Sequence, residues 1–317
     1  ESFTSREGGF LYNNLILLIM CFIILWGTLF PIISEAWDGN KIHIGANYFN
    51  QLNVPIGIVL LFLMGIGPLL SWKNTSSSTF ISNFSIPMIL SFISGLFYMI
   101  FTDEFKIYPF ITSMGIVFTL TSIIGELQKS FKSSYNNNNS LSKTILQLLS
   151  KNRHKNGGYI VHIGITLLFV GFVGRAFEVE KEFVLSPGEE IYFANHIFKL
   201  NNVTSEARDN HYAFISDMDV VDENNKYLTT LYPEKRIYFY WNPDPDKRQP
   251  HSELDIYSTM SKDIYSIFSS YDAQKNEAYF KIMINPLVNW VWIGGIVIVF
   301  GALFAFWPSS RRNYGTV

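Results

Sequence analysis

Long apolar runs separated by short polar segments dominate the sequence. A helix that crosses the hydrocarbon core of a bilayer needs about 20 predominantly apolar residues. The pattern therefore predicts about six membrane-spanning helices, at 10–33, 55–72, 86–101, 108–127, 159–177 and 286–307. Two of them carry an amide residue shortly before a proline, Asn53 before Pro55 and Asn285 before Pro286, which predicts a capped helix start at each place.

A different pattern fills the segment from 178 to 285. Short runs rich in β-branched and aromatic residues alternate with turn sequences such as "SPGEE" and "DENNK". Nine strands are predicted, at 182–185, 190–194, 197–203, 211–221, 227–232, 236–241, 253–258, 263–270 and 279–284. The predicted fold is a polytopic α-helical membrane protein with a small extracytoplasmic β-rich domain, barrel-like or sandwich-like, inserted before the last helix.

Lys and Arg residues set the expected orientation, because cytoplasmic loops of membrane proteins carry an excess of them. Arg6, Lys73, the basic segment at 129–155 and the pair Arg311 and Arg312 fall on one side if all six runs span. The expected organisation is four helices at 1–128, a cytoplasmic polar and basic linker at 129–156, a fifth helix at 157–177, a periplasmic β-rich domain at 178–285, and a last helix with a cytoplasmic tail at 286–317.

Composition excludes several classes of protein. Hydrophobic residues make up 48% of the 317 residues and charged residues 16%, with a formal net charge of -2, which argues against general nucleic-acid binding. Cys21 is the single cysteine, so the chain has no disulfide of its own and no C-x-x-C-H motif for covalent haem attachment. Hydrolase and nucleotide-binding motifs are also absent.

His162 is the candidate functional residue, because it is an ionisable group inside a predicted span. At about 100° per residue, Gly164 and Gly171 fall opposite His162, while Tyr159 and Thr166 share its face. We expect an interior helix with one small-residue face for close packing. The imidazole could be hydrogen-bonded to a neighbouring helix, could ligate haem iron, or could belong to a proton relay, and one histidine does not choose among these.

Seven strings that occur in order resemble the CcmF-type cytochrome c haem lyases of the cytochrome c maturation system. They are "SREGGFLYNN", "WGTLFPIISE", "GANYFNQLNVPIG", "LLFLMGIGPLLSW", "NGGYIVHIGITLLFVGF", "PEKRIY" and "INPLVNWVWIGG". The resemblance covers nearly the whole chain. It implies the C-terminal part of such a lyase, located in the bacterial inner membrane with its β-rich domain in the periplasm. The absence of an initiating Met agrees with the expectation of a truncated or split product.

The resemblance also implies cofactors and partners. His162, in "GGYIVHIG", matches one of two axial ligands of a permanent transmembrane b-type haem, and a second haem is the substrate to be attached to apocytochrome c. The expected partners are an N-terminal half with a Trp-rich segment, a periplasmic haem chaperone, apocytochrome c, a thiol-handling maturation subunit and membrane lipid. Catalytic residues are not assigned.

Two other functions stay open from the sequence. One is a non-catalytic membrane-anchored scaffold whose β-rich domain recruits assembly partners. The other is a proton-coupled transporter, which is disfavoured because no intramembrane carboxylate pairs with His162 and Glu126 lies near a helix end.

Overall fold

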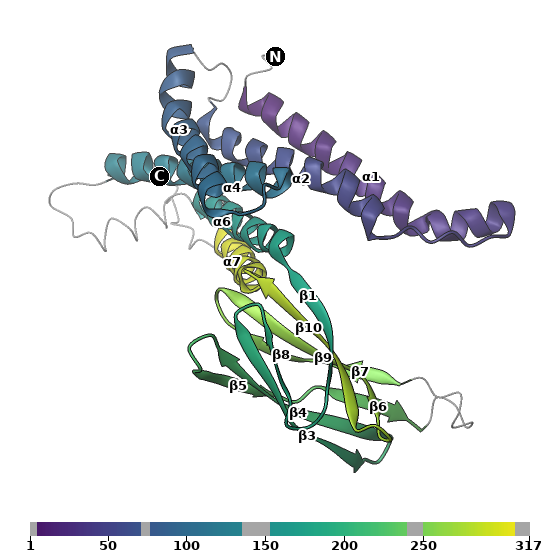
Figure 1. The fold of residues 1–317 in the computed structure, drawn as a ribbon. Coiled ribbons are helices and arrows are strands. Elements are labelled where there is room, and N and C mark those ends of the chain that lie inside the picture. Colours follow the sequence, from purple (N-terminus) through teal and green to yellow (C-terminus); the bar gives the residue numbers. More distant parts are fainter. Residues whose placement is uncertain (1–4, 71–76, 135–152, 240–249, 308–317) are drawn as a thin grey trace, which may run out of the picture. The chain divides into compact units, whose positions relative to one another are not determined.

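The computed structural model describes residues 5–70, 77–134, 153–239 and 250–307. They form two compact units, a helical unit and a unit of strands that comprises Gly174–Val291. Figure 1 labels most elements of both units.

The helical unit contains six helices that are long and apolar enough to cross a membrane, as the sequence predicts. They are α1 (Arg6–Asp38), α2 (Ala46–Leu69), α3 (Ser77–Phe101), α4 (Ile107–Ser134), α6 (Arg153–Gly174) and α7 (Asn289–Phe306). Most of the basic linker expected at 129–156 lies outside the described residues, while its two ends belong to α4 and α6.

Both predicted helix starts at an amide and a proline are wrong. Helix α2 begins at Ala46, two turns before Asn53, and Pro55 lies inside it. These extra turns pack on α1, where a Cβ added to Gly27 would come within 2.7 Å of the rings of Tyr48 and Phe49. Tertiary packing therefore extends this helix beyond its local start signal.

The second of these starts fails for a different reason. Asn285 and Pro286 end a strand, and α7 begins only at Asn289. The predicted start of the third helix at Ile86 is also late, because α3 begins at Ser77 with a polar stretch that hydropathy does not detect. Asn83 in this stretch donates a hydrogen bond to the carbonyl of Leu69 at 3.1 Å, which joins α3 to α2.

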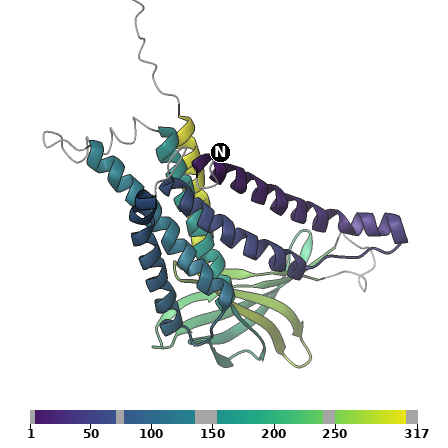
Figure 2. The same ribbon diagram turned by 90° about the horizontal axis from the view of Figure 1, so that it is seen from above.

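Helix α4 packs between α2 and α3, and Figure 2 shows these helices running alongside one another. The hydroxyl of Thr119 on α4 donates to the carbonyl of Leu61 on α2 at 2.8 Å, and Ser91 on α3 donates to the carbonyl of Met114 at 2.9 Å. Such interhelical hydrogen bonds from small side chains are typical of membrane helix bundles. A short 3-10 helix, η1 (Arg175–Phe177), follows α6.

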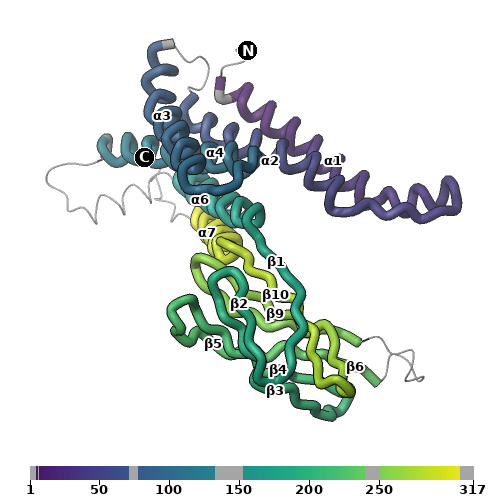
Figure 3. The backbone as a smooth tube through the Cα atoms, in the orientation of Figure 1, coloured from purple at the N-terminus to yellow at the C-terminus, as the bar shows by residue number. Residues whose placement is uncertain are grey.

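The strands form two antiparallel sheets, which Figure 3 traces along the chain. The four-stranded sheet has the order β1-β10-β9-β8, and the six-stranded sheet has the order β2-β3-β4-β6-β7, with β5 also paired to β4. The strands are β1 (Val179–Leu185), β2 (Glu190–Phe193), β3 (His196–Ala207), β4 (His211–Asp222), β5 (Tyr227–Leu231), β6 (Glu234–Tyr238), β7 (His251–Glu253), β8 (Asp255–Ser258), β9 (Lys262–Asp272) and β10 (Glu277–Pro286).

A single hydrophobic core joins the two sheets into a sandwich. Phe198, Met218 and Val220 enter it from the six-stranded sheet, while Phe268 and Phe280 stack at 5.0 Å from the four-stranded sheet. All five are 1% exposed or less. Alternating inward residues from two facing sheets are what a β-sandwich requires, so the sandwich form of the predicted β-rich domain is confirmed.

Candidate functional site

The candidate residue His162 lies well inside α6, which is the fifth of the six long apolar helices. The first turn holds Arg153, His154 and Lys155, and the apolar run follows. At a rise of about 1.5 Å per residue, His162 lies roughly 14 Å along the helix from Arg153. This depth places the imidazole beyond the basic end of the span.

The face of α6 opposite His162 packs backbone to backbone on α7. A Cβ added to Gly164 would lie 2.8 Å from the carbonyl oxygen of Gly294, and a Cβ added to Gly157 would lie 2.8 Å from that of Gly301. Glycines on both helices therefore permit a contact closer than any side chain allows. The predicted small-residue face is confirmed at Gly164, and Gly157 adds a second contact two turns earlier.

The face that carries His162 points away from α7. Thr166, four residues later, is fully buried, and its hydroxyl donates a hydrogen bond to the carbonyl of His162 at 2.8 Å. Phe169 lies on the same side of the helix, about 20° from His162 by helical geometry. The Phe169 ring lies 3.7 Å from the position of a Cβ built on Gly57 of α2, so this face turns toward α2.

One nitrogen of the His162 imidazole, Nδ1, is buried without a hydrogen-bond partner among the described residues. A buried polar atom without a partner costs about 1–3 kcal/mol. Either nitrogen of a neutral imidazole can ligate a metal, so a metal-bearing group bound to Nδ1 would compensate the cost. The imidazole therefore fits as a ligand of an iron-bearing group such as haem.

Glu126, the carboxylate considered as a partner for His162, is paired with two lysines. Glu126 on α4 pairs with Lys129 at 3.0 Å and with Lys155 at 4.0 Å, and Lys129 also donates to the side-chain oxygen of Asn83 at 2.8 Å. The cluster joins α3, α4 and α6. Because Glu126 is committed to two lysines, it is not a partner for His162, and the proton-relay interpretation loses its carboxylate.

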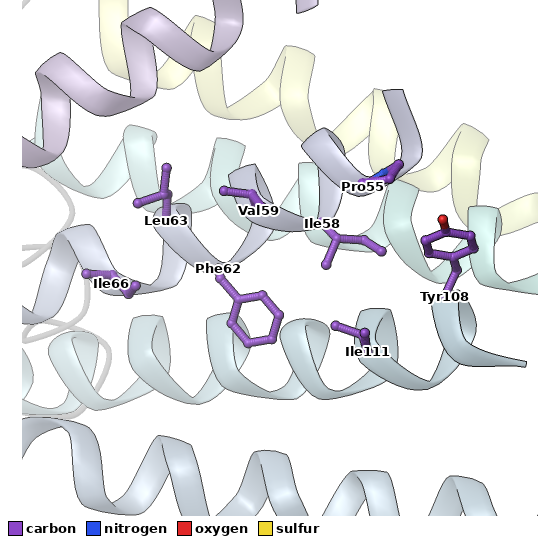
Figure 4. Close-up of a pocket in the computed structure, with 8 residues that line it drawn as sticks. All are labelled: Pro55, Ile58, Val59, Phe62, Leu63, Ile66, Tyr108 and Ile111. Atoms are coloured by element: carbon purple, nitrogen blue, oxygen red, sulfur yellow. The ribbon is translucent and has the colours of Figure 1, made fainter. Parts of the chain in front are cut away.

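An apolar cavity of about 420 Å³ lies along α2 and the start of α4, as Figure 4 shows. Its lining residues are Pro55, Ile58, Val59, Phe62, Leu63, Ile66, Tyr108 and Ile111. The α2 residues among them occupy the side of that helix opposite Gly57. The cavity is therefore on the far side of α2 from the contact with Phe169, and it does not belong to the His162 site.

The remaining described histidines do not assemble into a metal site. No group of three His, Cys, Asp or Glu side chains with metal-binding geometry occurs in the described part of the chain. His154 makes an edge contact with the ring of Phe306. His196, which sequence reasoning did not single out, is 1% exposed and hydrogen-bonded through Nε2 to the ammonium of Lys262 at 2.8 Å.

Comparisons with known proteins show what the whole chain and its sandwich are similar to. Residues 176–286 match the family model "CcmF C-terminal beta-sandwich". The "Cytochrome c-type biogenesis protein CcmF" of Haemophilus influenzae is 25% identical over 97% of the chain and 46% of its own length. The protein of the same description from Pseudomonas fluorescens is 27% identical over 95% of the chain and 43% of its own length.

A solved structure described as "Cytochrome c Heme Lyase CcmF" has the same fold. Its TM-score is 0.76 at 18% identity, and the match covers 97% of the chain and 46% of that structure. The chain therefore spans about half the length of the relatives that it matches. The chain is therefore similar over nearly its whole length to part of the CcmF-type proteins, and its sandwich matches the model of their C-terminal β-sandwich.

Proposed function

We propose that this chain is part of a cytochrome c haem lyase, which assists the covalent attachment of haem to the C-x-x-C-H motif of apocytochrome c. The relatives are described as cytochrome c-type biogenesis proteins, and the matching structure as a haem lyase. Haem is then a substrate of the assembly. Because the chain spans less than half of each relative, the activity belongs to the assembly that includes an N-terminal half.

His162 is the proposed axial ligand of a permanent b-type haem in the membrane. The observation that carries this assignment is the buried Nδ1 without a partner, on the α6 face opposite the glycine contact with α7. A bound haem supplies an iron that can pass one electron at a time, which is the cofactor's chemistry and not the protein's. The chain's own contribution is to hold the imidazole in place.

A backbone contact between α6 and α7 positions the proposed ligand. The backbone contact between Gly164 and Gly294 fixes the rotation of α6 about its axis, because a turned helix would bring a side chain into that contact. Within the described helices the other histidine is His154, on the same helix two turns earlier, so it cannot bind the opposite side of the same iron. We infer that the N-terminal half supplies the second imidazole.

The orientation of the assembly follows from charge. Lys129 and Lys132 lie at the C-terminal end of α4, and Lys155 lies at the N-terminal end of α6, opposite the end that leads into the sandwich. The positive-inside rule favours the cytoplasm for these basic ends. The sandwich is then periplasmic and the membrane is the bacterial inner membrane. On that side it could receive a haem chaperone, apocytochrome c and a thiol-handling subunit.

The test is a spectrum of the assembled membrane protein. The chain is co-expressed with the N-terminal half, and reduced-minus-oxidised spectra of the purified complex should show a low-spin b-type haem. His162→Ala should remove most of this signal at equal protein level, whereas His154→Ala should retain it. An unchanged spectrum in His162→Ala would reject the ligand assignment.

A scaffold function is the second candidate, favoured by the complete hydrophobic core of the sandwich. In this case the sandwich recruits assembly partners and the helices only anchor it. The two functions separate in cells that depend on the chain for cytochrome c production. Normal production with His162→Ala would favour the scaffold, and lost production would favour the haem lyase part.

A further inference from the structure

Three oxygen-bearing side chains meet at one end of the four-stranded sheet. Asp263 on β9 lies directly opposite Asn285 on β10. Glu178 immediately precedes Val179, which pairs with Ile284, so Glu178 is the next residue beside Asn285. Directly opposed residues of an antiparallel pair point to the same face with Cβ atoms about 5 Å apart. Since Ile264 and Ile284 point into the core, this trio lies on the outer face of the sheet.

Despite its place on the outer face, Asp263 is only 2% exposed. Its Oδ1 is buried without a hydrogen-bond partner among the described residues, and so is Oδ1 of Asn285. Two buried acceptor oxygens in adjacent positions lack a donor, and burying an unpaired carboxylate is strongly unfavourable. Something that carries positive charge or a donor is needed between them.

The described part of the chain supplies no such cation. Lys262, the neighbour of Asp263 in sequence, lies on the opposite face with its ammonium on His196. Arg175 pairs with Glu178 at 3.9 Å through a side chain that is 84% exposed. Asp263 takes part in no ion pair among the described residues. Of the two carboxylates, Asp263 therefore lacks a matched positive group.

Tyr265 lies two residues from Asp263 on the same strand face, and its side chain is hydrogen-bonded to that of Asn285. Glu178, with 22% of its side chain exposed, leaves the group an open side.

We propose that Asp263, Asn285 and Glu178 form a binding site for a hard divalent cation, with Ca²⁺ as the expected occupant. Carboxylate and amide oxygens are the ligands that Ca²⁺ prefers, and main-chain carbonyls and water complete its coordination of six to eight oxygens. With no nitrogen or sulfur donor in the trio, transition metals are disfavoured. Only two of the three ligands are acidic, and the amide supplies the third.

The consequence is a clamp on the ends of the sandwich. Glu178 is the residue before β1, and Asn285 is the second-last residue of β10, just before Pro286. A cation held by both and by Asp263 would tie the first and last strands to β9. Divalent cations would then stabilise the domain, independently of whether the chain serves a haem lyase.

The test uses the full chain in detergent micelles after removal of divalent ions with a chelator. Ca²⁺ should raise the unfolding temperature of the sandwich, as a ligand that binds only the folded state must, and Tb³⁺ should give luminescence on excitation of nearby tyrosine. Asp263→Asn and Glu178→Gln should each weaken both responses at least tenfold. Asp209→Asn, at an exposed bend, is the matched control and should leave both responses unchanged.

Asn285→Asp separates the site from a plain hydrogen bond. An added carboxylate should tighten Ca²⁺ binding at a cation site. If instead the amide nitrogen of Asn285 donates to Asp263, Asn285→Asp will place two carboxylates together and lower stability whether or not Ca²⁺ is present, which overturns the proposal. A Ca²⁺ response that is the same in Asp263→Asn as in the unmodified chain would also overturn it.

Discussion

Two adjacent glycines of α7 give a sharp test of how the ligand-bearing helix is held. A Cβ added to Gly294 would lie 2.6 Å from the carbonyl oxygen of Gly164 and 2.9 Å from the amide nitrogen of Leu168. At Gly295, the next residue, an added Cβ would meet no atom within 4 Å. Gly294→Ala must therefore push α6 and α7 apart, whereas Gly295→Ala has room.

The expected difference follows from the atoms in contact. The obstructing atoms at Gly294 are backbone, so they cannot rotate away as a flexible side chain would. Overpacking of this kind costs about 1–3 kcal/mol. At Gly295 an alanine should be neutral or should stabilise the helix by up to about 1 kcal/mol. The free energies of unfolding of the two variants should then differ by about 2 kcal/mol or more.

The assay is unfolding of the full chain from mild micelles by added dodecyl sulfate, followed by circular dichroism at equal protein concentration. The same comparison on α6 uses Gly164→Ala against Gly158→Ala, because a Cβ at Gly158 also meets no atom within 4 Å. Equal losses within either pair would refute the backbone contact between the two helices.

Two further predictions concern charge in the sandwich. Burial lowers the pKa of His196 below its ordinary value of 6.5, so at acid pH the unfolded chain binds this proton more readily than the folded chain. The free energy of unfolding should therefore fall as the pH drops below about 6.5. His196→Asn should flatten this dependence when thermal melts are recorded over a range of pH. Burial alone would raise the pKa of Glu234, but hydrogen bonds from Arg236 and Arg208 lower it overall. Glu234→Gln should therefore lose about 1–2 kcal/mol of stability at pH 7, after allowance for solvent screening. This loss should shrink below the ordinary glutamate pKa of 4.5, and Glu180→Gln, half-exposed, should cost less in the same chemical denaturation.

The sequence predicts most of the elements because their signals are local. Apolar runs of spanning length predict all six helices, and short runs rich in β-branched and aromatic residues predict the strands. The run at 253–258 predicts one strand, but Leu254 separates β7 from β8, which belong to different sheets. Pairing between sheets is a long-range property, so no short run of residues reveals where such a strand divides.

The candidate site was predictable only in part. Helical geometry alone placed Gly164 and His162 on opposite faces, and the contact of Gly164 with α7 confirms the small face. Which helix would approach it could not be predicted, because six similar apolar helices offer no local preference. The grouping of Asp263 with Asn285 was equally hidden, since 22 positions separate them in sequence and only the β9–β10 register joins them.

The sandwich is inserted in the sequence between α6 and α7, and two contacts that resemble each other are compatible with this insertion. The two helices pack backbone to backbone through their glycines, which keeps their chains close along the spans. In the sandwich, the first and last strands are also direct neighbours, with Val179 opposite Ile284. A domain whose two ends lie side by side can be inserted between two such helices without forcing them apart. The helix that carries His162 can thus keep its contact with α7 while the chain between them forms a separate core.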